Sequence, residues 1–292
     1  MGRMGLIRHI AASYDGAMLA SAEFEHVVHM WDIKTFVRRT TFATTLDFGG
    51  ERLAVSRDGR TLAVGAYKRH GVAAYDAATG AELWRRKDLK KPQYVSFAND
   101  DRSIWCCFDE RPCTNLDAKD GCTVTTIRGV RKLWESPHGD DRVTETRRGY
   151  TLLRRGSKPI NIPRITFAAI DVAFSESAFC ISEAAGPVRL FNLASGAQLW
   201  RHDPPQYTHF LEVSYSPNLA QFTGVSWPCM YGGDYVLNLF DNKSGAVRAL
   251  GAVGPCYTMA FFDRGSRMVN ALGSVFEVAS GKLVTKLEFP TE

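Results

Sequence analysis

Apolar and polar residues alternate along the chain in short runs of strand length, and glycines and small polar residues separate these runs. In residues 52–86, for example, RLAVS, TLAVGA, GVAAYD and AELWRR are separated by turn-forming segments such as RDGR and AATG. Runs rich in Val, Leu, Tyr and Trp between Gly, Asp and Asn clusters are typical of β-strands joined by turns. The spacing of an amphipathic helix is nowhere sustained. We therefore expect an all-β chain.

A turn phrase of the form Asp-x-x-Thr/Ser-Gly recurs at nearly regular distances. Its clearest copies are residues 76–80, 192–196 and 241–245, and weaker copies lie at 32–36, 117–121 and 277–281. The mean spacing of about 41 residues matches a four-stranded propeller blade. Over 292 residues this period predicts seven blades, with six or eight as alternatives. We expect one domain over residues 1–292, a seven-bladed β-propeller of four-stranded antiparallel blades, with an eroded fourth blade at about 125–165.

The turn phrase has a local physical cause. An Asp or Asn side chain accepts hydrogen bonds from backbone amides two residues further on, and Gly supplies the positive φ that closes the reversal. Each phrase is therefore expected to end one strand and start the outer strand of its blade. A single blade buries too little apolar surface alone, so the blades are expected to stack into a ring.

Two sets of motifs resemble known propeller families. MWD at residues 30–32 and SRDGRTLAVG at 56–65 resemble the WD-repeat β-propellers of bacteria, and TGAELW at 79–84 and SGAQLW at 195–200 resemble blades of quinoprotein-type propellers. The Gly-His pair of a strong WD repeat is missing, and Tyr75, Phe191 and Phe240 stand where the family has its Trp. The resemblance implies degenerate repeats held together by hydrophobic packing rather than by the family's hydrogen-bond network.

The two ends of the chain predict how the ring closes. The chain begins near an inner strand at residues 7–12 and ends with an outer strand at 282–287. Each blade is then covalently complete. Closure is expected to rest on packing between the first and last blades.

Candidate catalytic and metal-binding residues are few. His26 and His29 are three residues apart, which puts them on opposite faces of a strand and disfavours a shared metal. Cys106, Cys107 and Cys113, together with the more distant Cys122, contain no Cys-x-x-Cys pair, so we expect unpaired thiols. No phosphate loop, nucleophile elbow or paired-carboxylate signature occurs.

These observations predict a protein that is not an enzyme and holds no metal or cofactor. The tryptophans Trp84 and Trp200 recur at one repeat position, which indicates blade packing rather than chemistry. The alternative, implied by the quinoprotein resemblance, is an oxidoreductase with a redox cofactor and a metal. The chain is shorter than those exported enzymes and shows no export signal.

Two predicted loops on one rim carry aromatic residues. The loop SWPCMYGGD at 226–234 contains Trp227, Met230 and Tyr231, and the loop before it contains Tyr207. Exposed aromatic side chains commonly supply the hot spots of protein interfaces. We predict that these four residues anchor a partner protein. The alternative for Trp227 is that it covers the edge of its own blade.

Positive charge gathers in two stretches, although the net formal charge is only +5. The stretch 128–164 holds ten basic and four acidic residues, and it includes Arg147, Arg148, Arg154 and Arg155. A second cluster consists of Arg86, Lys87 and Lys90, with Lys68 and Arg69 on a neighbouring loop. Such groups steer an acidic protein or a phosphate backbone, or form a solvated polar face. Nucleic acid is the weaker alternative, because no aromatic residues interleave with the charges.

The leading hypothesis is a non-enzymatic propeller that binds another protein, acidic or a toxin, through its rim loops. The absence of a leader, of a membrane-spanning run and of an even cysteine set predicts a cytoplasmic location without membrane contact. Single-domain bacterial propellers of this size include toxin-neutralising immunity proteins, which act as inhibitors, and assembly scaffolds. The residues do not choose between these two.

Overall fold

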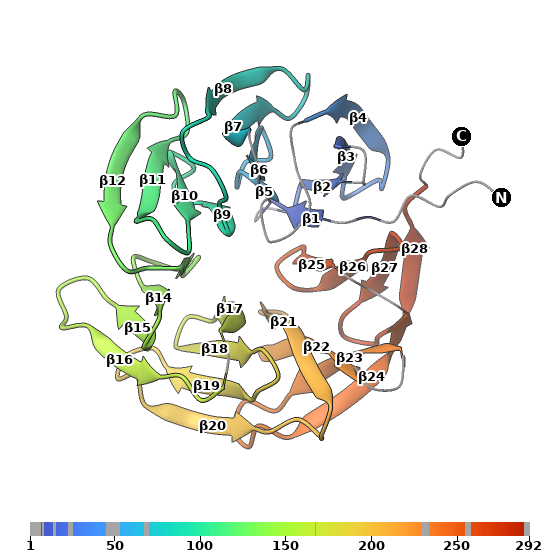
Figure 1. Cartoon of the computed structure of the whole chain (residues 1–292). Coiled ribbons are helices and arrows are strands. Elements are labelled where there is room, and N and C mark those ends of the chain that lie inside the picture. Colours follow the sequence, from blue (N-terminus) through green and yellow to red (C-terminus); the bar gives the residue numbers. More distant parts are fainter. Residues whose placement is uncertain are drawn as a thin grey trace.

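Each alternating run of the sequence forms one strand of a four-stranded antiparallel sheet, and seven such sheets stand as blades around a central axis (Figure 1). The computed structural model describes residues 7, 9–13, 16–22, 26–44, 53–66, 70–166, 168–228, 234–254 and 258–288. The predicted all-β fold and its seven blades are confirmed.

The strands follow the chain blade by blade. Blades 1 to 3 consist of β1 (His9–Ala12), β2 (Met18–Ala22), β3 (Val27–Asp32), β4 (Arg38–Ala43), β5 (Leu53–Val55), β6 (Thr61–Ala66), β7 (Gly71–Asp76), β8 (Glu82–Arg86), β9 (Tyr94–Phe97), β10 (Ser103–Cys107), β11 (Cys113–Asp117) and β12 (Thr123–Ile127). Blade 4 consists of β13 (Lys132–Glu135), β14 (Arg142–Thr146), β15 (Gly149–Leu153) and β16 (Ile160–Pro163). The eroded blade is therefore a complete sheet, within the predicted range.

Blades 5 to 7 continue the same order. Their strands are β17 (Ala169–Phe174), β18 (Ala178–Glu183), β19 (Val188–Asn192), β20 (Gln198–His202), β21 (Thr208–Ser216), β22 (Gln221–Pro228), β23 (Tyr235–Phe240), β24 (Val247–Gly254), β25 (Met259–Phe262), β26 (Arg267–Asn270), β27 (Ser274–Glu277) and β28 (Leu283–Lys286). In every blade the first strand lines the centre and the fourth lies outermost (Figure 1).

The turn phrases form the hydrogen bonds expected of them. Asp76 Oδ1 accepts bonds from the backbone N of Ala78 at 3.1 Å and of Thr79 at 2.8 Å. Gly80 has a φ of 73° and donates its N–H to the carbonyl of Asp76 at 2.8 Å. Asp241 forms the same bonds with Lys243 and Ser244 in blade 6. The predicted cause of the repeat is confirmed.

The turn glycine also makes room for the preceding blade. Trp84 of β8 lies against Gly121 of blade 3, and Trp200 of β20 lies against Gly245 of blade 6. A Cβ atom on either glycine would come within 2.7 or 2.8 Å of the indole ring. Each indole Nε1 donates to a backbone carbonyl of the same turn, at 2.8 and 3.0 Å. The prediction that these tryptophans serve blade packing is confirmed.

The ring closes by packing, as the two ends of the chain predict. β1 starts blade 1 and β28 ends blade 7, and among the described strands none is shared between the two blades. An apolar cluster fills the seam, with each member at most 3% exposed: Leu19, Trp31, Ile33, Phe262, Val269, Val275 and Leu287. The burial of these side chains stabilises the closed ring.

Hydrogen bonds between buried side chains accompany this packing inside single blades. Trp31 Nε1 donates to Ser21 Oγ at 2.8 Å between neighbouring strands of blade 1. Asn238 Nδ2 donates to Ser226 Oγ at 2.8 Å in blade 6. The missing Gly-His pair therefore does not remove every polar contact between strands.

The expectation of unpaired thiols is wrong for two cysteines. Cys107 and Cys113 form a disulfide between the facing ends of β10 and β11, where their Cα atoms are 4.1 Å apart. The bond is possible because the hairpin register places the two residues opposite one another, which spacing alone does not show. Cys106 is unpaired and buried, and burial raises the pKa of its thiol.

Candidate functional site

The strand order gives the ring two different faces. Neighbouring strands are antiparallel, so the chain crosses from one face to the other with every strand. The loops between blades and the loops between second and third strands therefore share one face, here called the loop face. The turns between first and second strands and between third and fourth strands share the other, here called the turn face.

Blade 6 has the longest strands and an aromatic group at the loop face. β21 has nine residues, whereas the inner strands of the other blades have three to six. The end of the β21–β22 ladder pairs His209 with Trp227. The Trp227 ring stacks on Tyr235, with centroids 5.7 Å apart and an interplanar angle of 8°. Trp227 is half-buried, so these contacts fit the alternative in which it covers its own blade.

Tyr207 differs from Trp227 in its exposure. It lies in the loop before β21, its side chain is 45% exposed, and its φ is 63°. A bulky residue in the left-handed region costs about 1 to 2 kcal/mol. Met230 and Tyr231, the other predicted anchors, lie outside the described residues.

The second predicted cluster lies at the end of β8 and in the loop after it. Lys87 and Lys90 are exposed on the loop face. Arg86 instead bonds within the protein: its guanidinium pairs with Asp88 at 2.8 Å and donates to the carbonyl of Gly121 at 2.8 Å. Lys68 and Arg69 lie outside the described residues.

The basic stretch of blade 4 is not one surface. Arg147 and Arg148 form the loop between β14 and β15 and are exposed on the loop face. Arg154 and Arg155 follow β15 and lie on the turn face, where they pair with Asp141 at 3.4 Å and Asp140 at 3.3 Å. The interpretation of these four arginines as a single patch is wrong.

Three further arginines of the stretch 128–164 are used by the fold. Arg142 pairs with Glu135 at 2.9 Å, and Arg164 pairs with the buried Glu145 at 2.6 Å. Arg131 pairs with Asp109 of blade 3 at 2.5 Å. These three arginines therefore form ion pairs within the protein, although Arg131 and Arg142 remain partly exposed.

A buried polar cluster lies between blades 4 and 5, and the sequence pattern did not predict it. Glu183 and Arg189 are at most 2% exposed and form an ion pair. The Glu183 carboxylate also accepts bonds from the backbone N of Ile165 and Thr166. Burial, together with nearby carboxylates, raises the pKa of Tyr150. The sequence does contain a signal for this cluster, because Glu183 and Arg189 occur in the otherwise largely apolar strands β18 and β19.

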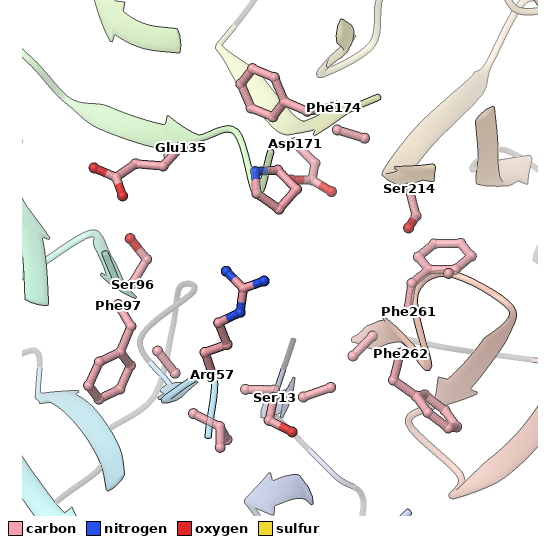
Figure 2. A pocket seen from close by; sticks show the side chains of 18 of the residues that line it. Ser13, Arg57, Ser96, Phe97, Glu135, Asp171, Phe174, Ser214, Phe261 and Phe262 are labelled. Atoms are coloured by element: carbon pink, nitrogen blue, oxygen red, sulfur yellow. The ribbon is translucent and has the colours of Figure 1, made fainter. Parts of the chain in front are cut away.

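The inner strands enclose a central cavity of about 490 Å³, lined by residues of all seven blades. Figure 2 shows Arg57 reaching into it, with Glu135 and Asp171 on the opposite side. Glu135 accepts hydrogen bonds from Trp105 Nε1 at 3.0 Å and from the backbone N of Asn99 at 2.9 Å, and it forms an ion pair with Arg142. Asp171 accepts bonds from the backbone N of Val172 and Val213, at 2.8 and 3.2 Å. Both carboxylates are thus held by the propeller itself.

Other predicted sites can be located in the part of the chain that the structure describes. His29 is buried in β3, with Nδ1 2.9 Å from Thr41 Oγ1, and His26 precedes that strand. Within the described ranges, no three His, Cys, Asp or Glu side chains are placed to hold a metal ion. No helix in these ranges has the length and apolar character needed to cross a membrane.

Comparisons with known proteins bear on the fold. No family model matches the chain, and no curated protein is similar to it in sequence. The structure of U3-55K is similar, with a TM-score of 0.69 and 14% identity over 92% of this chain and 89% of that one. The likeness to quinoprotein dehydrogenases stays a prediction. At this identity the likeness shows the fold alone, which is a seven-bladed β-propeller.

Proposed function

We propose that this chain is a non-enzymatic, protein-binding propeller whose partner docks on the loop face. A ring of packed sheets holds its loops in fixed positions, which suits recognition of a protein surface. The WD40-like fold supports this class of function, because such propellers typically serve as protein-binding scaffolds.

Tyr207 is the observation that carries the proposal. It is a large aromatic side chain, 45% exposed, and its backbone adopts a conformation unfavourable for such a residue. Strained backbone persists where the surrounding structure enforces it, and it is concentrated at functional sites. Partly exposed tyrosines bury much apolar area on binding and keep a hydroxyl for hydrogen bonding.

The neighbouring aromatic residues support the same location. The Trp227–Tyr235 stack lies next to Tyr207, because β21 begins at Thr208 and pairs through His209 with Trp227. The stack joins β22 to β23 at the end of blade 6 where β21 begins, directly after Tyr207. A preorganised anchor loses little conformational entropy when the partner binds.

The test compares capture of proteins from the native cells by three immobilised chains. These are the wild type, Tyr207→Ala, and Leu199→Ala as a matched control. Leu199 is 50% exposed but lies on the outer strand β20, away from the loop face. We expect a protein retained by the wild type and by Leu199→Ala to be lost with Tyr207→Ala. Equal retention by all three chains would contradict the proposal.

A further inference from the structure

The loop face of blades 2 to 4 carries a concentration of positive charge. Its described loops are residues 87–93, 108–112, 128–131 and 147–148, here called the basic sector. They contain eight basic and three acidic residues: Lys87, Lys90, Lys91, Arg111, Arg128, Arg131, Arg147 and Arg148 against Asp88, Asp109 and Glu110. Part of each charge cluster of the sequence thus lies on the loop face.

Contacts between the loops make the basic sector continuous. Arg111 of blade 3 donates to the carbonyl of Asp88 in the preceding loop at 2.6 Å. Arg131 of blade 4 pairs with Asp109 of blade 3 at 2.5 Å. The loop 108–112 is therefore bonded on both sides, and the disulfide between Cys107 and Cys113 closes its base. Loops 87–93, 108–112 and 128–131 are thus joined by side-chain contacts, and the loop 147–148 follows them on the same face.

Most acidic groups of the sector are already neutralised. Asp88 pairs with Arg86, and Asp109 pairs with Arg131. Glu110 is exposed and has no ion pair among the described residues. It lies in the blade 3 loop, between the lysines of residues 87–91 and the arginines of blade 4. The sector therefore consists of two positive regions on either side of Glu110, because Arg111 of the same loop reaches to the carbonyl of Asp88 on the side of the lysines.

We propose that the basic sector binds an acidic segment of a partner protein, in which two acidic runs flank a basic residue. This rests on the proposed function and names the partner's chemistry. The acidic runs face the lysines of loop 87–93 and Arg147 with Arg148, and the basic residue faces Glu110. Complementary charge of this kind fixes register and raises the association rate.

A nucleic-acid backbone fits this arrangement less well. A duplex carries a negative charge about every 1.7 Å along its axis, and its backbone has no positive group that could face Glu110. Its phosphates would meet the Glu110 carboxylate. Among the described residues of the basic sector the single aromatic, Phe108, is only 2% exposed, so it offers no surface on which bases stack.

The test uses two synthetic peptides of equal composition. In the first, Gly-Lys-Gly separates two glutamate runs, and in the second the lysine is moved to the end. At about 0.15 M salt, where long-range charge effects are screened, we expect the wild type to prefer the first peptide. Replacing Glu110 by Gln should abolish that preference. Equal affinity of the wild type for both peptides would overturn the inference.

Matched charge reversals locate the site. Arg147→Glu with Arg148→Glu changes the loop face of blade 4, and Arg155→Glu with Lys158→Glu makes the same charge change on its turn face. All four residues are exposed, and unfolding curves check that both variants fold. We expect the first pair to weaken binding of the first peptide by about tenfold or more, and the second by less than about twofold. Equal losses would contradict the assignment.

Two further results separate this inference from the proposed function. A duplex DNA that displaces the first peptide at equal concentration would overturn the inference in favour of a nucleic acid. If Tyr207→Ala loses the captured protein while the Arg147→Glu, Arg148→Glu chain retains it, the proposed function stands and the acidic segment does not. Loss of the captured protein with both variants supports both.

Discussion

The indole ring of Trp84 occupies the space that a Cβ atom on Gly121 would need: that atom would lie 2.7 Å from Trp84 Cε3. Gly121 closes the turn phrase of blade 3, while Trp84 belongs to the outer strand of blade 2. The glycine therefore serves two purposes, its positive φ and the close approach of the neighbouring blade. The repeat phrase encodes contacts between blades as well as the turn itself.

Gly121→Ala separates these two purposes when it is compared with Gly156→Ala. Both glycines have a φ near 72°, but a Cβ on Gly156 would meet nothing within 4 Å. We expect Gly156→Ala to lower the free energy of unfolding by about 1 to 2 kcal/mol. Gly121→Ala should lose about 1 to 3 kcal/mol more, because Trp84 must move. Urea unfolding measures both, and equal losses would show that the indole contact contributes nothing.

Trp227→Ala is expected to lower stability, whereas Tyr207→Ala is expected to leave it nearly unchanged. Trp227 is half-buried and stacks on Tyr235, so its removal takes away an aromatic pair and apolar contacts worth about 1 to 3 kcal/mol. Tyr207 is 45% exposed. Thermal and urea unfolding curves measure the stability of both variants. An unchanged midpoint for Trp227→Ala would show that its ring is free to serve a partner.

We expect the turn carboxylates to make the free energy of unfolding fall at acid pH. The hydrogen bond from Arg39 at 2.6 Å, together with the backbone N of Thr35, lowers the pKa of Asp32 from 3.8 to about 2. The carboxylate binds a proton less readily in the folded chain than in the unfolded chain. Its contribution to the free energy of unfolding is therefore complete above pH 3.8. It is lost as the pH falls toward about 2.

Asp32→Asn tests this pH dependence. Asn192 shows that an amide oxygen can take the same place, since it accepts a bond from Ser195 N at 2.9 Å. We expect wild type and variant to differ in unfolding midpoint near neutral pH and to converge as the pH falls from 3.8 toward about 2. A difference that stays constant over this range would refute the assignment.

Arg189→Leu should be strongly destabilising, because it leaves the Glu183 carboxylate buried without its cation. Loss of one partner of a buried ion pair costs about 3 to 5 kcal/mol. Arg201→Leu is the control, because Arg201 pairs with Asp203 at 2.6 Å but both side chains are at least 40% exposed. We expect it to cost less than about 1 kcal/mol. Similar losses from both variants, measured by urea unfolding, would contradict this account of the buried pair.

The repeat allowed the fold to be predicted because its cause is local. An Asp such as Asp76 bonds to the next residues of its own turn, so the phrase is readable without tertiary knowledge. The packing of Trp84 was predictable for a related reason, since a tryptophan recurs at the same offset from that phrase. Periodicity also located blade 4, which has no such phrase.

The candidate site was less predictable because it depends on the direction of each strand. Arg148 and Arg154 are six positions apart, yet β15 runs between them and sends them to opposite faces of the ring. The eroded blade has no turn phrase from which that strand could be recognised. The pairing of Cys107 with Cys113 depended in the same way on a hairpin register that the sequence does not state.

The most direct test of loop-face binding is hydrogen exchange of the captured complex compared with the free chain. The account predicts slower exchange in residues 87–93, 128–131 and 203–207, which belong to the loop face. It predicts no change in the turn-face segments 98–102, 136–141 and 154–159. Protection confined to the turn face would contradict the central claim.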